Sequence, residues 1–478
     1  MSSAVPSVTA NAGTHGTRRA PRPIRASAVA MRTRNPIRAI VDGLRVVPNP
    51  DKPMLSLALG DPTTFGNFKL HRSAVDAVKH KLDSYSANGY PPSIGTETAR
   101  KSLAAKYSRP AAPLTDKDVI IASGVRLVIG LLPPRSRCSD ALNLSIGVLC
   151  NEGQNILLPA PGFSLYETLA SSKGIECRFY NLLPERSWEI DVAHLESLID
   201  ANTACILINN PSNPCGSVYS KSHLLEILHV AERHDLPIIA DEIYADMVFK
   251  PHEFFPLATL TTTVPILSTG GLAKRYLVPG WRVGWVFVHD RDGRFDEASM
   301  RRTYCGSDIG AADLALLSWR TARLPLHTQV RRGLVNLSQL TLGANSLIQA
   351  AIPEILASPQ SFYDETMHQL EANARVSSEL LKGIPGIQPI FPQGAMYLMV
   401  EIKLDEFDGI KDDLDFVEKL VQEESVLCLP GKCFRCPRPF VRIVFTPPKD
   451  QLEVAYGRIR EFCVRHHRSA ASKKARTK

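Results

Sequence analysis

Short apolar runs that recur along the chain constrain its fold more than any other feature. They are VIIAS, NILLP, ACILIN, LPIIAD, VPILST and VGWVFV, at residues 119–123, 155–159, 204–209, 236–241, 264–269 and 283–288. Between the third and fourth runs, Leu224, Leu228 and Ala231 recur with helical spacing and predict a helix over residues 222–234. Continuous apolar strands separated by helices predict an α/β fold, with a mostly parallel sheet covered by helices on both faces.

Length and charge limit the classes of protein that this chain can represent. Its 478 residues exceed what one core usually carries, so a large domain with a smaller partner is expected. Residues 1–41 hold seven arginines and no acid, and residues 465–478 hold six Lys or Arg and no acid, so the net charge of +8 leaves 8 − 13 = −5 for the body. Basicity confined to the tails argues against a nucleic-acid-binding face. No apolar run reaches the ~20 residues of a membrane span.

Ten cysteines without disulfide-like spacing favour a reducing compartment, and we expect a cytoplasmic protein. The acid-free N-terminus also fits a mitochondrial transit peptide, although Pro21 and Pro23 would break an amphipathic helix and a plain disordered tail fits better. Cys433 and Cys436 form a CxxC pair, but no second ligand pair follows them, so we expect no metal site.

Ligands of parallel sheets bind beyond the carboxyl ends of the strands, so the segments after the apolar runs should carry the chemistry. Asp241 ends the fourth run, Tyr244 lies three residues further on, and Lys274 follows the fifth run with Arg282 eight residues beyond it. The other runs are followed by Gly124, directly after Ser123, and by Phe163 and Asn213. A single lysine on a loop is ordinarily solvated, but this set of side chains suits one ligand, pyridoxal phosphate.

The chemistry of pyridoxal phosphate suggests a task for each side chain. Its aldehyde requires an amine for a Schiff base, which Lys274 would supply. Its pyridine nitrogen stays protonated beside a buried carboxylate, which Asp241 would supply. Tyr244 and Asn213 would donate hydrogen bonds to the ring phenolate.

The phosphate group and the flat ring of the cofactor need partners of another kind. Arg282 would bind the phosphate through its fork of donors, together with the backbone at the turn after Ser123 and Gly124. An aromatic face suits the ring, and Phe163 would supply it.

The motifs NNPSNPCG, ADEIY and GGLAKR with PGWRVGW resemble those of the fold-type-I aminotransferases, within the class I and II family. NPIRAIVDGL, GDPTTFGN, NGYPPSIG, PAPGFSLYETLA and PQGAMYLMVEI are similar to segments of the tyrosine aminotransferases within that family. The resemblance runs from about residue 34 to residue 466. It implies a large domain with a mostly parallel sheet between helices and a smaller α+β domain formed by the N- and C-terminal parts.

The resemblance assigns the same tasks to the residues at the strand ends and adds others. Lys274 would also move the proton between the substrate Cα and the cofactor, and Ser268 would join the phosphate site. Tyr90 would reach the phosphate of a neighbouring subunit, which implies a homodimer with shared active sites. Arg442 would bind the substrate α-carboxylate, with Gly60 in the substrate loop and Asn213 beside it. Cys138 and Ser139 would open the helix at the phosphate.

The resemblance further implies transamination of L-tyrosine with 2-oxoglutarate, giving 4-hydroxyphenylpyruvate and L-glutamate as the first step of tyrosine breakdown. The expected division is a basic tail at 1–33, a small-domain segment at 34–75, a large domain at 76–345, a small domain at 346–465 and a second basic tail at 466–478. The expected partners are small substrates and a second copy of the chain, without nucleic acid or membrane.

Two stretches depart from the family pattern. Residues 125–137, VRLVIGLLPPRSR, separate Ser123 and Gly124 from Cys138 and Ser139, which are contiguous in the family. Either the insert bulges outward or its first residues start a new helix at the phosphate. Because the insert is strongly apolar, we expect a distorted phosphate site and weaker cofactor binding. A second stretch, about 298–330, is expected to be a surface loop or an added helix.

Other functions share parts of this pattern. The nearest alternative is an aminotransferase that prefers kynurenine, alanine or another aromatic amino acid. A β-eliminating lyase of the same fold fits the motifs less well. A catalytically impaired relative is a further alternative because of the insert, whereas a transcription regulator would need a longer N-terminal segment than this chain has.

Overall fold

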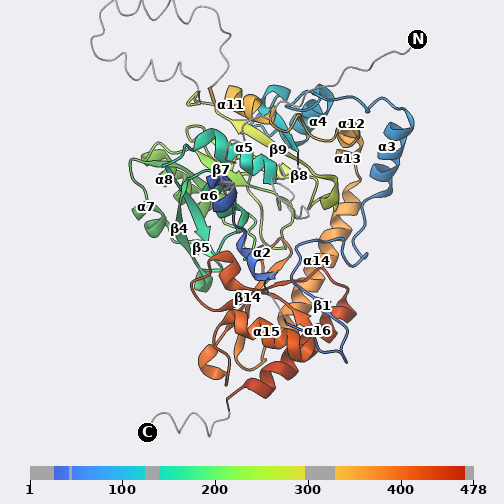
Figure 1. Ribbon diagram of the computed structural model, residues 1–478. Helices are drawn as coiled ribbons and strands as arrows, with labels where there is room; N and C mark the ends of the chain where they lie inside the picture. Colours follow the sequence, from blue (N-terminus) through green and yellow to red (C-terminus); the bar gives the residue numbers. More distant parts are fainter. Residues whose placement is uncertain (1–25, 42, 44–45, 124–138, 296–328, 469–478) are drawn as a thin grey trace, which may run out of the picture.

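The structure is a computed structural model that describes residues 26–41, 43, 46–123, 139–295 and 329–468 (Figure 1). The insert at 125–137, most of the stretch at 298–330, Gly124 and Cys138 lie outside the described residues. Within the described ranges, the largest sheet of the protein has eight strands in the order β2-β9-β8-β7-β6-β3-β4-β5. These strands are β2 (Val119–Ser123), β3 (Asn155–Ala160), β4 (Glu176–Leu183), β5 (Glu189–Ile190), β6 (Thr203–Asn209), β7 (Ile238–Asp241), β8 (Ile266–Gly271) and β9 (Val283–His289).

Helices cover both faces of this sheet, which confirms the fold expected from the apolar runs. On β6, Ile206 and Ile208 pack with the apolar face of the helix α8 (Lys221–Arg233). The alternate residues, Cys205 and Leu207, pack with α5 (Ser139–Leu149) and α6 (Leu165–Ser172) on the other face. Because side chains alternate along a strand, burial of both sets requires the continuous apolar run seen in the sequence.

The strand β9 runs against its neighbours, a reversal that its apolar sequence does not indicate. β3, β4, β6, β7 and β8 pair in parallel, whereas β9 pairs antiparallel with both β8 and β2. The chain between β8 and β9 contains no crossover α-helix and includes only the short 3₁₀ turn η4 (Pro279–Trp281). A parallel pair needs a longer crossover, so this short connection reverses the chain.

A second sheet lies toward the C-terminus, in the lower part of Figure 1. It is antiparallel, in the order β10-β11-β14-β13, and a short parallel pair joins β1 to β12. Its strands and the short pair are β1 (Leu55–Ser56), β10 (Ile387–Ile390), β11 (Tyr397–Ile402), β12 (Val426–Leu427), β13 (Leu429–Pro430) and β14 (Phe440–Val444).

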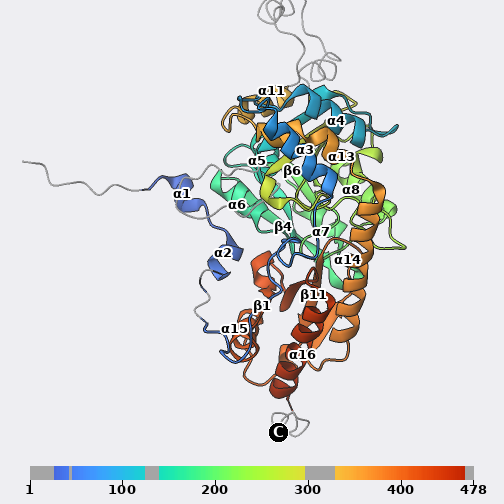
Figure 2. The same cartoon turned by 90° about the vertical axis from the view of Figure 1, so that its right-hand side faces the viewer.

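The long helix α14 (Gln360–Leu381) runs from the upper part of the molecule to the lower part in both ribbon views (Figures 1 and 2). α15 (Asp413–Glu424) and α16 (Lys449–His466) lie in the lower part of the molecule, and α16 packs against α14. The remaining helices are α1 (Ala28–Arg32), α2 (Pro36–Val41), α3 (Arg72–Asp83), α4 (Glu97–Tyr107), α7 (Val192–Ser197), α11 (Gln329–Ser338), α12 (Ser346–Ala350) and α13 (Ile352–Leu356).

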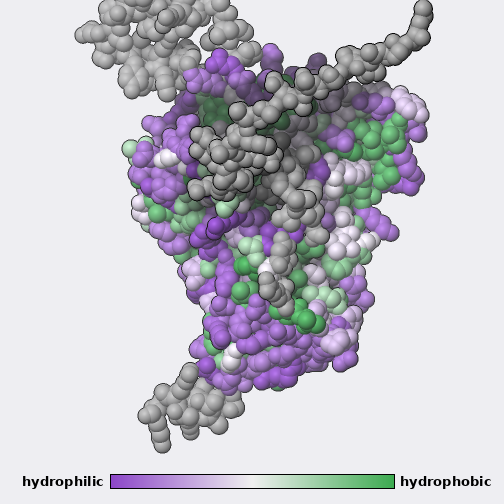
Figure 3. All heavy atoms as spheres, in the orientation of Figure 1, coloured by the Kyte–Doolittle hydropathy of each residue, from purple (hydrophilic) through white to green (hydrophobic). Residues whose placement is uncertain are grey.

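The surface of the molecule is uneven in polarity. In Figure 3, hydrophilic residues cover most of the lower part, and apolar residues gather over α3 at the upper right. None of the helices within the described ranges combines the length and the apolar composition needed to cross a membrane.

Candidate active site

The carboxyl edge of the parallel strands brings the expected side chains together. Asp241 is the last residue of β7, while Asn213 and Lys274 follow β6 and β8 by a few residues. Arg282 immediately precedes β9, and because β9 runs in the opposite direction its start lies at the same edge. The reversal of β9 is thus what brings Arg282 to the site, and Ser123 at the end of β2 is paired with Val283 beside it.

The Lys274 side chain is almost fully buried, with 5 % of its surface exposed. Its Nζ donates to the carbonyl oxygen of Gly60 over 2.6 Å and lies 3.4 Å from Tyr397 Oη. It also lies 5.2 Å from the centre of the Tyr244 ring. A buried lysine is rare unless its amine is partnered, and these partners hold the amine in place between the two sheets.

Asp241 is buried at the end of β7 and accepts three hydrogen bonds. Tyr166 Oη donates to its Oδ2 over 2.7 Å, and Thr269 Oγ1 and the backbone N–H of Ile243 donate to its Oδ1 over 3.3 Å each. Burial nevertheless raises the pKa of Asp241 to about 6, and the bond from Tyr166 is the largest of the effects that lower it. A cation placed beside this carboxylate would favour its charged form.

Tyr166 is a site residue that the strand-end pattern did not reveal. It lies in the first turn of α6, three residues after Phe163, and its ring meets the Phe163 ring edge-on at 5.6 Å between centroids. Helical geometry puts residues three apart on one face, so a predicted helix starting just after Phe163 could have pointed to it.

Arg442 is buried on β14, where its guanidinium donates to Asn213 Oδ1 over 2.8 Å and to the carbonyl of Ala58 over 2.6 Å. Its Nε is buried, and no described residue forms a hydrogen bond with it. Among the described residues no carboxylate lies within salt-bridge distance of it. Burial lowers the pKa of Arg442, so a negatively charged ligand would compensate for that loss of solvation.

Tyr397, the first residue of β11, lies at the centre of these groups and was also missed from the sequence. Its hydroxyl lies 2.6 Å from Tyr244 Oη, and its ring lies 4.4 Å from Arg442 Cζ. A Cβ atom built on Gly60 would lie 2.5 Å from Tyr397 Oη, so a larger residue at that position would displace the Tyr397 hydroxyl. Its position inside an apolar run, PQGAMYLMVEI, concealed Tyr397 as a core residue of a strand.

The start of α5 lies near Ser123 and Arg282, as expected for a phosphate site. Asp140 in its first turn is buried, and burial raises the pKa of Asp140 to about 6, while hydrogen bonding from the Ser123 backbone and the charge of Arg282 lower it. This carboxyl was not predicted as part of the site. Ser139 begins the helix, but Gly124 and Cys138 lie outside the described residues, so this side of the site is described only in part.

Tyr90 lies apart from the other site residues on an exposed loop, with 91 % of its surface accessible. The structure thus does not bring Tyr90 to the site of its own chain. Phe163, by contrast, is half-buried and packs against Tyr166, whose hydroxyl donates to the Asp241 carboxylate.

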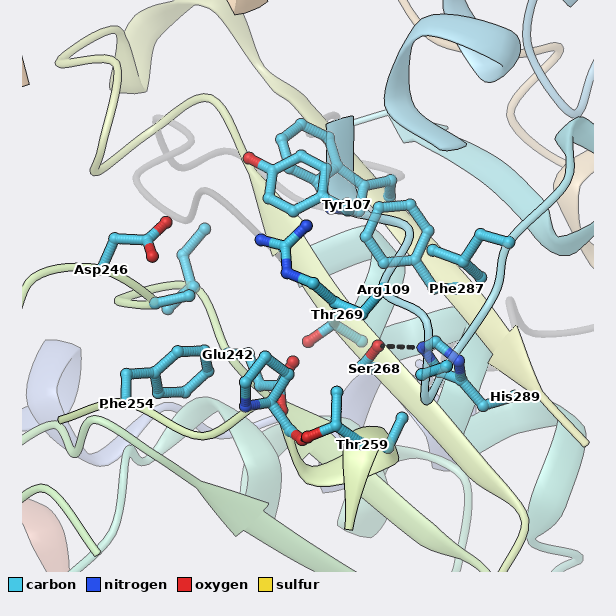
Figure 4. A pocket seen from close by; sticks show the side chains of 18 of the residues that line it. Tyr107, Arg109, Glu242, Asp246, Phe254, Thr259, Ser268, Thr269, Phe287 and His289 are labelled. Carbon is cyan, nitrogen blue, oxygen red and sulfur yellow. Dashed lines mark hydrogen bonds between the residues drawn. The ribbon is translucent and has the colours of Figure 1, made fainter. Parts of the chain in front are cut away.

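Ser268 is not brought together with the other expected phosphate ligands. Its hydroxyl lies 3.1 Å from His289 Nε2, in a separate pocket of about 70 Å³ that Glu242, Tyr107 and Phe287 also line (Figure 4). Thr269, the next residue on β8, contacts Asp241, and neighbouring side chains of a strand point to opposite faces. The resemblance assigned Ser268 to the phosphate, whereas the structure turns its hydroxyl toward His289.

The CxxC pair is enclosed by the fold. Burial raises the pKa of both Cys433 and Cys436 to about 12, so their thiols are poor metal ligands and nucleophiles. Across the described ranges, no group of three or more His, Cys, Asp or Glu side chains could hold a metal ion.

Comparison with known proteins identifies the family. Residues 52–459 match the family model for aminotransferase class I and II. The chain is 49% identical to the tyrosine aminotransferase of Mus musculus over 94% of this chain and 89% of that protein, and 44% identical to that of Dictyostelium discoideum over 90% and 94%.

Solved structures agree with this assignment. The crystal structure of the tyrosine aminotransferase from Leishmania infantum has a TM-score of 0.78 at 34% identity, covering 94% of this chain and all of that chain. An alanine aminotransferase from Pyrococcus furiosus has a TM-score of 0.77 at 27% identity, covering 92% and 100%. The chain therefore belongs to the class I and II aminotransferases.

Proposed function

We propose that this aminotransferase uses pyridoxal phosphate to transfer the amino group of L-tyrosine to 2-oxoglutarate, giving 4-hydroxyphenylpyruvate and L-glutamate. The choice of L-tyrosine rests on the identity to tyrosine aminotransferases along nearly the whole chain. The observation that carries the chemistry is the position of Lys274 and Arg442 against one side chain. Nζ of Lys274 lies 5.8 Å from the centre of the Tyr397 ring, and Cζ of Arg442 lies 4.4 Å from it.

Both cationic groups thus lie against one side chain, which suits a substrate that carries an amino group and a carboxylate on the same carbon. Arg442 would hold the carboxylate of either substrate through its unpartnered Nε, while Asn213, already bonded to Nη1, keeps the guanidinium in position. Lys274 would then remove the proton from the substrate Cα as a general base and deliver it to the cofactor as a general acid. Both side chains are buried, so bulk water competes little with these interactions.

The residues present fit pyridoxal phosphate. Lys274 would bind its aldehyde carbon, Asp241 its pyridine nitrogen, Tyr244 and Asn213 its ring oxygen, and Phe163 its ring face. Arg282 with Ser123 and the first turn of α5 would bind its phosphate. The raised pKa of Asp241 supports this fit. Its three hydrogen bonds do not offset the effect of burial, and a protonated pyridine nitrogen beside the carboxylate would favour its charged form. When bound, the cofactor supplies a ring that accepts electrons released at the substrate Cα.

Arg442→Met should raise KM for L-tyrosine and for 2-oxoglutarate together, because both carry the carboxylate that Arg442 would bind. Charged hydrogen bonds contribute roughly 1.5–3 kcal/mol each, so a rise of about 10–150-fold is expected in steady-state kinetics. Arg442→Lys is the matched control. It keeps the positive charge but not the planar fork of donors, so its KM values should lie between those of the wild type and those of Arg442→Met. A rise for only one substrate would refute the assignment.

Tyr166→Phe should move the acidic limb of the pH–rate profile to higher pH. The Tyr166 hydroxyl donates to Asp241 and lowers the pKa of Asp241, so its removal lets the carboxylate take up a proton at higher pH. A hydrogen bond to a charged group is worth about 1.5 kcal/mol or more, which corresponds to a shift of about one pH unit. An unchanged acidic limb would show that Asp241 does not control it.

We also propose that the enzyme is a homodimer with shared sites. Large apolar side chains with more than half of their surface exposed gather near Tyr90, namely Leu82, Tyr85, Leu340 and Leu342. The two segments that carry them are adjacent, because Ser346 Oγ donates to the carbonyl of Ala87 over 2.5 Å. Apolar residues also gather over α3 in Figure 3. A patch of this kind marks a protein–protein contact, and it would place Tyr90 against a second copy.

Deletion of residues 125–137 should tighten cofactor binding and raise turnover, because the sequence predicts that they disturb the start of the phosphate-binding helix. A helix N-terminus attracts a phosphate only where its first N–H groups are aimed at it. Titration of pyridoxal phosphate into both forms, followed by turnover measurements, tests this. Equal affinity and equal turnover in the two forms would show that the insert is harmless. Turnover that appears only in the form without residues 125–137 would identify the full chain as an impaired enzyme.

The domain limits and the location of the protein are proposals as well. Pairing of β1 with β12 supports a smaller unit built from parts of 34–75 and 346–465. The helices α12 and α13 share a core with α4, so they pack with the large domain although they lie after residue 345. The eight cysteines within the described ranges are free thiols, which supports a cytoplasmic protein.

A panel of amino donors tests the proposed substrate. Purified protein with pyridoxal phosphate and 2-oxoglutarate should form glutamate fastest from L-tyrosine, and more slowly from alanine and kynurenine. A higher kcat/KM for alanine would favour the activity that the similar Pyrococcus furiosus enzyme carries in its name, and no glutamate from any donor would refute the proposal.

A further inference from the structure

Tyr397 contacts three groups of the candidate site, yet none of the tasks assigned above belongs to it. It is 2 % exposed and contacts the Lys274 amine, the Tyr244 hydroxyl and the Arg442 guanidinium. The two ends of the side chain differ in their contacts. The hydroxyl meets Lys274 and Tyr244, whereas the ring face meets Arg442.

In the cofactor-free protein, the hydrogen bonds of the Tyr397 hydroxyl have a defined direction. Within the described part of the chain this hydroxyl contacts two polar groups, the Lys274 amine at 3.4 Å and the Tyr244 hydroxyl at 2.6 Å. A lysine ammonium only donates, so Tyr397 accepts from Lys274. A buried hydroxyl proton needs an acceptor, and the remaining acceptor is the Tyr244 oxygen. Tyr397 therefore donates to Tyr244.

This direction decides where the Tyr244 proton points. Because the Tyr244 oxygen accepts from Tyr397, its own proton is turned away from Tyr397. The pair packs edge to face, with ring centroids 5.6 Å apart and planes at 80°. The short contact between the two hydroxyls thus orients one donor of the site.

We propose that Tyr397 is a positioning residue that directs the Tyr244 hydroxyl proton toward the ring oxygen of the bound cofactor and, through its ring, holds the Arg442 guanidinium. This inference rests on the proposed use of pyridoxal phosphate. It separates two effects of one side chain. The hydroxyl acts through Tyr244 on the cofactor, and the ring acts through Arg442 on the substrate carboxylate.

A double-mutant cycle on cofactor affinity tests the first effect. Pyridoxal phosphate is titrated into cofactor-free full-length wild type, Tyr397→Phe, Tyr244→Phe and the double variant. One hydrogen bond is worth about 0.5–1.5 kcal/mol, so each single variant should bind about 3–10-fold more weakly. The double variant should bind no more weakly than Tyr244→Phe, because Tyr397 acts through Tyr244.

A pair of substitutions at Tyr397 tests the second effect. Tyr397→Phe keeps the ring and should leave KM for both substrates within about twofold of wild type while kcat falls. Tyr397→Leu removes the ring and should raise both KM values about 3–10-fold, as expected for loss of a buried cation–π contact. Circular dichroism and thermal melting identify a variant that fails to fold, in which case the Phe variant alone decides.

The outcomes separate this inference from the proposed function. Additive losses in the cycle, an unchanged affinity in Tyr397→Phe, or a KM rise in Tyr397→Phe equal to that in Tyr397→Leu would overturn the role of Tyr397 alone. A wild type that does not bind pyridoxal phosphate would overturn the proposed function and this inference together.

Discussion

Replacement of Lys274 by alanine should abolish amino-group transfer while the protein remains folded. Lys274 Nζ lies within contact distance of the Gly60 carbonyl, the Met396 sulfur and the Tyr397 hydroxyl, and none of these three groups is an amine that could form a Schiff base. Positioned proton transfer alone contributes roughly 10²–10⁴-fold to a rate, and the covalent role of the amine adds to it. Glutamate formation from L-tyrosine should therefore fall more than about a thousandfold.

Lys274→Arg is the matched control for charge and burial. It keeps a cation at the site but offers no amine that can attack the cofactor, so it should be as inactive as the alanine variant. Both variants should keep the circular dichroism of the wild type. Activity above about one per cent in either variant would show that another group performs the chemistry.

Asp241→Asn should retain much of the cofactor but lose most of the rate. An amide cannot stabilise a protonated pyridine nitrogen as a carboxylate does, and the ring then accepts electrons poorly. Single-turnover measurements should show a fall of more than about tenfold, equivalent to ~1.4 kcal/mol in the barrier. A smaller fall would exclude Asp241 as the partner of the ring nitrogen.

The same variant has a stability signature in the cofactor-free protein. Burial raises the pKa of Asp241 to about 6 from an unfolded value of 3.8, so between these values the folded state binds more protons than the unfolded state. Its contribution to stability is therefore present below about pH 4 and is lost as the pH rises toward 6. Relative to Asp241→Asn, the wild type should lose about 3 kcal/mol across this window, measured by urea denaturation.

The strands of the parallel sheet could be predicted from the sequence because burial on both faces demands continuous apolar runs. VIIAS coincides with β2, and the helix expected at 222–234 coincides with α8 to within one residue. The strand β4 was missed because it mixes polar and apolar residues, Glu176–Leu183, and its exposure is uneven along its length. The reversal of β9 was missed because apolar character does not encode strand direction.

Residues of the candidate site could be predicted from the sequence where they follow the end of a strand. Residues that only tertiary packing brings to the site could not be predicted. Asp241, Asn213 and Lys274 follow strands, so one edge of one sheet gathers them. Tyr166 and Tyr397 read as ordinary apolar positions of a helix and a strand, and only their hydroxyl contacts reveal a role. Ser268 was assigned to the phosphate by resemblance, but side chains alternate along β8, so Thr269 faces Asp241 while Ser268 faces His289.

Borohydride reduction of the protein with bound pyridoxal phosphate, followed by peptide mapping, tests the central claim most directly. Reduction fixes the cofactor to the amine that holds it, and mass spectrometry then locates the added mass. The account predicts the modification on the peptide that contains Lys274, and on no other lysine at comparable yield. Modification of a different lysine, with the Lys274 peptide unchanged, would contradict it.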